Sequence, residues 1–183
     1  MPHESSECVS ALGLAPDDPT GAEVKNLYTD HKYHNIGTPF NREIPNVAAG
    51  EKRGLSEHII NQAKVADGFF KTPTVRNVAK GLDGSGKGKA YAHNGWFKKL
   101  ETIVHFYNTR DVLPKCDELS SPIINATEAE ATNPDGSIKC WPKAEFPGFV
   151  TPIVGNLQLL PDEEKAIVAY LKALSDDFTP TPP

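Results

Sequence analysis

Residues 91–108 read YAHNGWFKKLETIVHFYN, and the interpretation of the whole chain starts from this stretch. Its apolar residues recur at the spacing i, i+3, i+4 and i+7, which places them on one face of a helix. They are Leu100, Ile103, Val104 and Tyr107. The spacing predicts a helix over 98–108. A tyrosine on such a face is ordinarily a core residue whose hydroxyl reaches a backbone partner.

The segments around this helix predict a second helix and long loops. Pro161 and the acidic residues after it suit a helix N-terminus, and they predict a helix over 161–174. Its expected buried residues are Ile167, Val168, Leu171 and Leu174. Ser56 is expected to cap a short helix that ends near Ala66.

Most of the remaining chain is expected to be irregular. Thr72 precedes Pro73, so the segment 69–79 should begin extended and then turn into a short helix. Residues 113–152 form a long insert rich in Pro, Asn, Ser and Thr, and an irregular insert of this length needs an anchor. No segment shows the alternation of apolar and polar residues that is typical of a β-strand. The sequence therefore predicts a mainly α fold with long irregular loops and little or no β structure.

Composition excludes several classes of protein. The chain has 183 residues and a net charge of −5, which argues against a nucleic-acid-binding protein because phosphate binding requires clustered positive charge. It holds no apolar run of the roughly 18–20 residues that span a membrane. The first residues, MPHESSEC, lack the charged and apolar regions of a signal peptide.

The sequence offers only weak catalytic or metal-binding motifs by itself. The glycine-rich stretch 81–89 lacks the flanking strand and helix of a phosphate-binding loop. His31 and His34 lie in a segment that does not read as helical, so they do not indicate a zinc site. His93 lies in a turn marked by Asn94-Gly95. None of the three cysteines belongs to a CxxC pair.

Four motifs, in order, resemble the C-terminal half of the dihaem cytochrome c peroxidase and MauG family. They are LYTDHKYHNIGTPFN (27–41), FFKTPTVRNVA (69–79), YAHNGWFKKLETIVHFYN (91–108) and LLPDEEKAIVAYLKALSD (159–176). The resemblance is interrupted by inserts at 81–89 and 116–147. It implies a cytochrome c-like haem domain over 27–176. The flanking parts are then an N-terminal segment, 1–26, and a flexible proline-rich tail, 177–183.

The resemblance assigns Tyr107 as an axial ligand of the haem iron. The matching position holds a methionine in the peroxidases and a tyrosine in the MauG branch, and the only methionine here is Met1. A tyrosinate oxygen stabilises ferric or higher-valent iron. The implied function is that of the electron-transfer half of a peroxidase-type oxidoreductase.

The same resemblance assigns further pocket residues. His93 matches a histidine that makes a hydrogen bond near the haem edge, although an ordinary turn histidine would explain it as well. Arg76 could pair with a haem propionate. The backbone carbonyls of Gly88 and Ala90 match calcium ligands, but the insert at 81–89 alters that loop. The remaining residues assigned to the pocket are Phe70, Thr72, Pro73, Trp96 and Leu100.

Two parts of the family pattern are missing from these 183 residues. There is no CxxCH haem-attachment motif, and the N-terminal cytochrome c domain is absent. We therefore expect Met1 to lie inside a longer gene, with residues 1–26 as the remnant that follows a lost CxxCH, and the chain alone to be inactive. The expected partners are that domain or an upstream CxxCH segment, and a small c-type cytochrome or other donor; a homodimer stays open. The alternative is a haem-free structural or interaction domain.

The family is usually periplasmic, which bears on the cysteines. Disulfides persist in an oxidising compartment, and Cys116 and Cys140 bracket most of the insert. We expect these two to form a disulfide, with Cys8 as the odd thiol. The alternative is two free thiols in a cytosolic protein.

Overall fold

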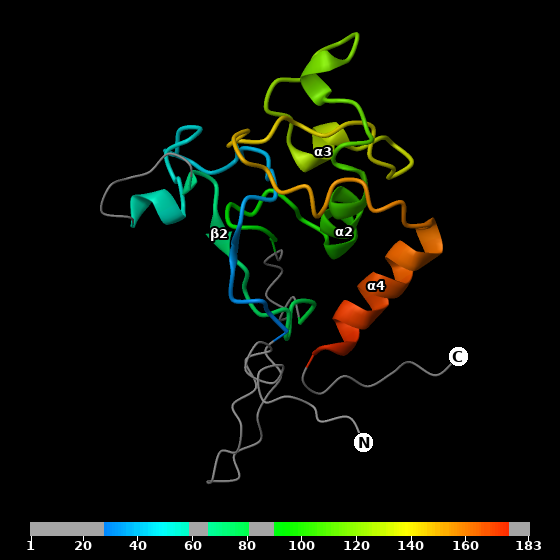
Figure 1. The fold of residues 1–183 in the computed structure, drawn as a ribbon. Coiled ribbons are helices and arrows are strands. Elements are labelled where there is room, and N and C mark those ends of the chain that lie inside the picture. Colours follow the sequence, from blue (N-terminus) through cyan, green and yellow to red (C-terminus); the bar gives the residue numbers. More distant parts are fainter. Residues whose placement is uncertain (1–27, 59–65, 81–89, 176–183) are drawn as a thin grey trace, which may run out of the picture.

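The two helices that hydrophobic periodicity predicts are both present and lie against each other (Figure 1). The computed structural model describes residues 28–58, 66–80 and 90–175. Within them α2 spans Leu100–Thr109 and α4 spans Pro161–Ala173. Leu100 and Val104 of α2 pack on Val168 of α4. The expectations for 1–26, for the stretch 81–89 and for the tail 177–183 concern residues outside the described part.

Helix α4 is attached to α2 more by polar contacts than by burial. Of its expected apolar stripe only Val168 is buried, whereas Ile167 is exposed. The carboxylate of Glu164 instead accepts from His105 Nδ1 at 3.0 Å and from Asn108 Nδ2 at 2.5 Å. The side chain of Asn108 also bonds the backbone of Leu159, just before α4 begins.

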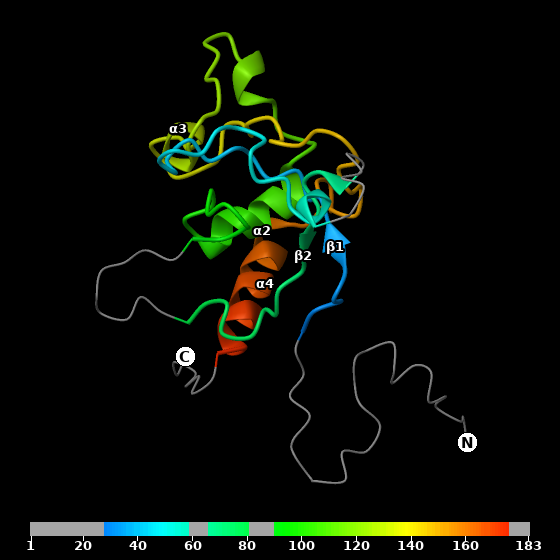
Figure 2. The ribbon, with the colours of Figure 1, turned by 90° about the vertical axis from the view of Figure 1, so that its left-hand side faces the viewer.

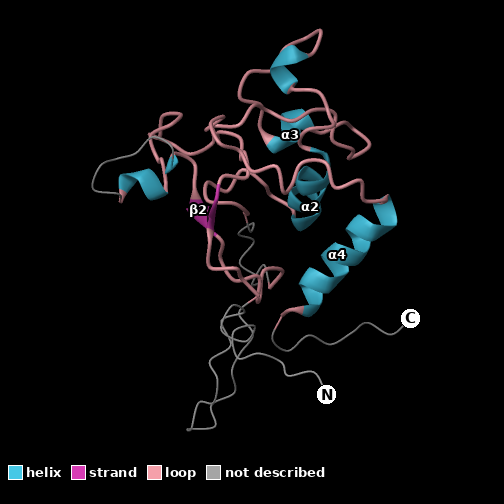
Figure 3. Ribbon diagram, viewed as in Figure 1, coloured by secondary structure: helices cyan, strands magenta, loops and turns pink. Residues whose placement is uncertain are grey.

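The prediction of a mainly α fold is wrong. In the described residues the α-helices are α2, α4 and the short α3, Glu128–Ala131, and most of the rest is loop (Figure 3). Strands β1, Tyr33–His34, and β2, Phe70–Lys71, form an antiparallel pair (Figure 2). The reason is that short polar side chains satisfy much of the loop backbone, so that a compact fold does not require long helices.

The prediction of an extended start to the segment 69–79 is confirmed by β2, and a turn over 76–79 follows it. The described part of the segment after Gly54 differs from the expected helix that Ser56 would cap. A 3-10 turn, η1, spans Leu55–Glu57 with Gly54 before it, and Ser56 lies buried inside the turn. Residues 59–65 lie outside the described part.

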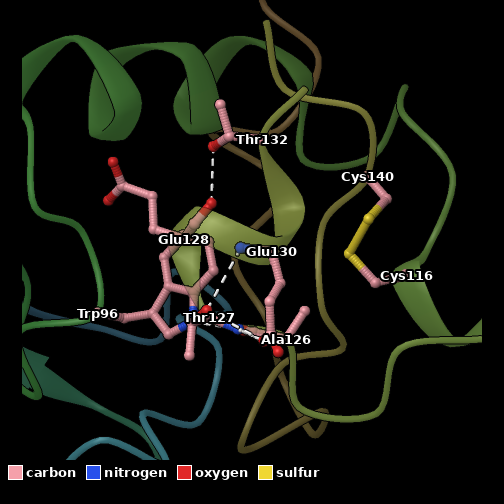
Figure 4. Close-up of a disulfide and its surroundings, with 8 residues drawn as sticks. All are labelled: Trp96, Cys116, Ala126, Thr127, Glu128, Glu130, Thr132 and Cys140. Carbon is pink, nitrogen blue, oxygen red and sulfur yellow. Dashed lines mark hydrogen bonds between the residues drawn. A yellow bond between two sulfur atoms is a disulfide. The ribbon is translucent and has the colours of Figure 1, made fainter. Parts of the chain in front are cut away.

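The insert 113–152 supplies most of the buried residues of the larger hydrophobic cluster. Cys116 opens the 3-10 turn η3, Cys116–Glu118, and is joined to Cys140 by the expected disulfide (Figure 4). Trp141 beside it is fully buried against Phe106 of α2. In both ribbon views the insert lies on one side of α2 and α4 on the other (Figures 1 and 2). Helix α2 is therefore the central element of the domain.

A second contact between the insert and the rest is made by the short helix α3 (Figure 4). Thr127 caps it by accepting from the backbone N–H of Glu130, while the Glu130 carboxylate accepts from the Thr127 N–H at 2.8 Å. The indole N–H of Trp96 donates to the carbonyl of Ala126 at 3.0 Å. Glu128 is buried and accepts from the Thr102 hydroxyl of α2 at 2.8 Å.

The guanidinium of Arg110, which follows α2, is only 6% exposed. Its Nη1 donates to the carbonyl of Ile36 at 2.8 Å, and its Nη2 to those of Thr151 and Val154 at 3.0 and 2.7 Å. Asp111 pairs with the same guanidinium. One side chain thus joins the loop after β1 to the chain that leaves the insert. In the described residues no helix is long and apolar enough to cross a membrane.

Removing the disulfide should destabilise the domain. The two cysteines are 24 residues apart, and closing a loop of this size contributes about 3 kcal/mol in the loop-entropy model. We expect the double variant Cys116→Ser/Cys140→Ser to lose about that much free energy of unfolding, measured with a chemical denaturant. As a control, a reductant should destabilise the wild type and leave the variant unchanged. Equal stabilities of the two proteins would contradict the prediction.

Replacing Arg110 should be costly because its loss leaves three carbonyls without a donor. We expect Arg110→Ala to lower the free energy of unfolding by about 3 kcal/mol. The matched control is Arg42→Ala, which removes an exposed ion pair with Glu130 and should cost less than about 1 kcal/mol. Similar losses for the two variants in denaturant titrations would show that the guanidinium of Arg110 does not hold these loops.

Candidate functional site

The turn that carries His93 is held on both sides by asparagine side chains. Asn94 Nδ2 donates to the carbonyl of Pro39 at 2.7 Å, and Asn41 Nδ2 donates back to the carbonyl of Asn94 at 2.9 Å. Gly95 takes a φ of +64°, a conformation that favours glycine. This explains locally why the sequence Asn94-Gly95 follows His93.

The His93 ring lies flat on the ring of Phe70. The ring centroids are 3.6 Å apart and the planes differ by 8°. Phe70 belongs to β2, so the small sheet supplies the surface on which the ring rests. The side chain of His93 is 16% exposed. Two residues that the sequence assigned to one pocket, from motifs about twenty positions apart, are thus brought together.

Glu145 is the member of this cluster that sequence reasoning missed. Its side chain is 4% exposed, its Oε1 accepts from the backbone N–H of Gly50 at 2.9 Å, and its Oε2 accepts from Asn94 Nδ2 at 3.4 Å. The same Oε2 lies 3.8 Å from His93 Nε2. Glu145 belongs to the insert, where no periodicity or motif marks it, and only long-range folding brings it here.

Tyr107 lies on α2, half-buried beside the core formed with the insert. Burial raises the pKa of its phenol above the ordinary value. Among the described residues its hydroxyl makes no hydrogen bond, and neither a hydrogen bond nor a ring contact joins Tyr107 to His93. The phenol therefore keeps an oxygen free to bind another group.

The other predicted pocket residues are dispersed. Trp96, 1% exposed, packs against Trp141 in the core with the insert, and Leu100 lies in the contact between α2 and α4. The carbonyl of Thr72 accepts from the Thr29 hydroxyl at 2.7 Å, and Pro73 is exposed. Arg76 lies in the turn after β2, where its backbone N–H donates to Thr74 Oγ1.

The described residues hold no ready chelating site for a bare metal ion. They contain no group of three or more His, Cys, Asp or Glu that could bind one. Gly88, one of the two expected calcium ligands, lies outside the described part, and Ala90 is exposed. Nothing supports calcium here. A haem iron makes a smaller demand, because its porphyrin supplies four ligands and the protein needs to offer only an axial atom such as the phenol oxygen of Tyr107.

Comparison with curated proteins finds one clear relative of part of this chain. The methylamine utilization protein MauG of Paracoccus denitrificans (strain Pd 1222) is 34% identical over 97 residues, which is 48% of this chain and 22% of that protein. The chain thus spans about a fifth of the length of this curated relative. No model of a known protein family matches the chain.

Two solved structures that align with this chain are a diheme peroxidase and a MauG-like protein. The diheme peroxidase BthA of Burkholderia thailandensis E264 aligns with a TM-score of 0.52 and 22% identity, over 93% of this chain and 39% of that protein. A MauG-like protein associated with microbial copper homeostasis aligns with a TM-score of 0.48 and 19% identity, over 79% of this chain and 33% of that one. The likeness to the diheme peroxidase shows that the chain shares its fold over part of that structure.

Removing the Asn94 side chain should loosen the turn that holds His93. Asn94→Ala loses the bond to Pro39 and leaves the buried Glu145 with one donor fewer, so we expect a loss of about 1–3 kcal/mol in the free energy of unfolding. The control Asn133→Ala removes an exposed bond to Ser137 and should cost about 0.5 kcal/mol or less. Equal effects of the two substitutions in denaturant unfolding would refute the structural role of Asn94.

Proposed function

Because this chain belongs to the MauG and dihaem peroxidase family, we propose that it is a haem-binding redox unit of a peroxidase-type oxidoreductase. When bound, the haem would supply the redox chemistry, with hydrogen peroxide as the oxidant. The protein's own residues would hold the haem, offer the axial atom and keep water from the iron.

The observation that carries this proposal is the phenol of Tyr107. It is half-buried on the central helix, it makes no hydrogen bond among the described residues, and its pKa is raised by burial. Since no group in the described part of the chain forms a hydrogen bond with this oxygen, it is available to bind a group from outside the chain. As a phenolate, that oxygen of Tyr107 would hold a ferric haem iron, which anionic oxygen donors stabilise. We therefore propose Tyr107 as the axial ligand.

Five residues in or near β2 have proposed roles around the haem. The stacked pair of Phe70 and His93 would form one wall, with an apolar ring below and a polar ring at its edge. Arg76 would pair with a propionate, because the fork of a guanidinium matches a carboxylate. Thr72 and Pro73 link β2 to the turn of Arg76, so they would set the distance between the wall and that charge.

The complete activity requires more protein than these residues. The chain covers 22% of the MauG relative and 39% of the diheme peroxidase, so we propose that the N-terminal cytochrome c domain, or an upstream segment with CxxCH, completes the enzyme. The electron donor would be a small c-type cytochrome and the compartment the periplasm. The disulfide between Cys116 and Cys140 supports an oxidising compartment.

The alternative function is a haem-free structural domain, which the lack of a CxxCH motif in these residues favours. The visible absorption spectrum of the natively matured protein separates the two functions. A Soret band supports the haem-binding unit, and its absence from a protein with full-length sequence supports the structural domain.

Replacing Tyr107 tests the axial ligand directly. We expect Tyr107→Phe to alter the charge-transfer bands and the spin state of the ferric protein, because the variant lacks the oxygen ligand. The matched control is Tyr170→Phe on α4, where the tyrosine is 55% exposed, and it should leave the ferric spectrum unchanged. Identical absorption and electron paramagnetic resonance spectra for Tyr107→Phe and the wild type would refute the assignment.

A further inference from the structure

The buried carboxylate of Glu145 lies beside the stacked ring of His93, and this arrangement has a chemical consequence for the histidine. We propose that Glu145 is a positioning residue that fixes neutral His93 as the tautomer with hydrogen on Nε2, leaving Nδ1 as the hydrogen-bond acceptor. The inference rests on the proposed function only in giving His93 a place in a haem pocket. The tautomer itself is argued from the geometry of five residues, Gly50, Phe70, His93, Asn94 and Glu145.

A carboxylate that is 4% exposed requires donors, since burying an unpaired charge is costly. Glu145 receives two, from the backbone N–H of Gly50 at 2.9 Å and from Asn94 Nδ2 at 3.4 Å. In the part of the chain that the structure describes, His93 is the one ionisable group within ion-pair distance of it, at 3.8 Å. An N–H on that ring would be a third donor to the charge.

The orientation of the ring decides which of its two nitrogens can donate a hydrogen bond to the Glu145 carboxylate. Nε2 faces Glu145 Oε2, and the stacking on Phe70 holds the ring plane. If hydrogen were on Nδ1, the lone pair of Nε2 would point toward a negatively charged oxygen, which is repulsive. With hydrogen on Nε2 the contact is attractive, and a small shift of the ring would close it to a hydrogen bond. The carboxylate therefore selects the Nε2–H tautomer.

The selection matters because the two ring nitrogens have opposite capacities in a neutral histidine. With Nε2 committed to Glu145, the free nitrogen Nδ1 can accept a hydrogen bond but cannot donate one. His93 would then hold a water or a donor group at its Nδ1 side and would not stabilise an oxyanion there. Glu145 would act on the pocket through His93, without touching a bound group itself.

The tautomer can be measured by long-range ¹H–¹⁵N correlation spectra of the protein labelled with ¹⁵N-histidine, recorded at a pH high enough for the ring to be neutral, with His93→Gln to assign the signals. We expect wild-type His93 to show the Nε2–H pattern. Glu145→Gln keeps the size and removes the charge, and it should lower the ratio of Nε2–H to Nδ1–H about tenfold, the change that an interaction of about 1.4 kcal/mol produces. The control Glu118→Gln, in the same insert but 61% exposed, should leave the ratio unchanged.

A second variant separates the charge from a merely structural role. Glu145→Asp keeps the carboxylate, and it should restore the Nε2–H pattern at least in part even if it lowers stability. An Nδ1–H pattern in the wild type, or an unchanged ratio in Glu145→Gln, would overturn the proposal. The measurement does not depend on haem. A protein without a Soret band would therefore refute the proposed function and still decide the role of Glu145.

Discussion

The buried guanidinium of Arg110 is the interaction on which the arrangement of the loops depends. Long segments of the described chain have neither a helix nor a sheet to satisfy their backbone. Arg110 supplies several donors at one point, and they reach carbonyls at Ile36, Thr151 and Val154. An arginine suits this task because its five N–H groups lie in a fixed planar fork. Because Arg110 directly follows α2, its hydrogen bonds hold both the loop after β1 and the end of the insert against the central helix.

Near the candidate site, asparagine side chains also hold irregular chain in place by donating to backbone carbonyls. Asn35 donates to the carbonyls of Phe146 and Gly148. A Cβ at Gly68 would lie 2.6 Å from Phe146 Cβ and 2.9 Å from Asn35 Nδ2. Gly68 also has a φ of +79°, so no other residue fits this position well. These contacts fix the chain directly after Glu145. The carboxylate of Glu145 can therefore reach the turn of His93 although its own segment is irregular.

The sequence allowed those parts of the fold to be predicted that depend on local pattern. Helices α2 and α4 follow from apolar spacing and from the proline and acidic residues at 161–164, and the disulfide agrees with the expectation from the insert and the compartment. The sequence predicts that the insert is irregular chain that needs an anchor, and the disulfide is such an anchor. The contribution of Trp141 to the core could not be predicted, because aromatic residues from distant segments bury one another without any periodicity in the sequence. The mainly α prediction failed because short polar side chains satisfy much of the loop backbone, so that the fold does not require long helices.

The candidate site shows the same division. The resemblance of the motifs selected Phe70 and His93, whose rings are stacked in the structure. It also selected Trp96, whose indole is buried in the core. Glu145 could not be found, because its contacts with Gly50 and Asn94 span 95 and 51 residues. The motifs therefore predicted the contact between Phe70 and His93, whereas long-range packing places the other assigned residues elsewhere.

These observations give the insert a functional place in the molecule. Its aromatic core covers one side of α2, its disulfide closes the loop, and Glu145 lies against the turn that presents His93. Tyr107 sits on the same helix, half-buried beside that core, so the surroundings of its phenol are set by the insert as well. A chain with the insert deleted would keep the motifs of the family and lose the contacts that orient both residues. The segment that interrupts the resemblance is therefore part of the candidate site.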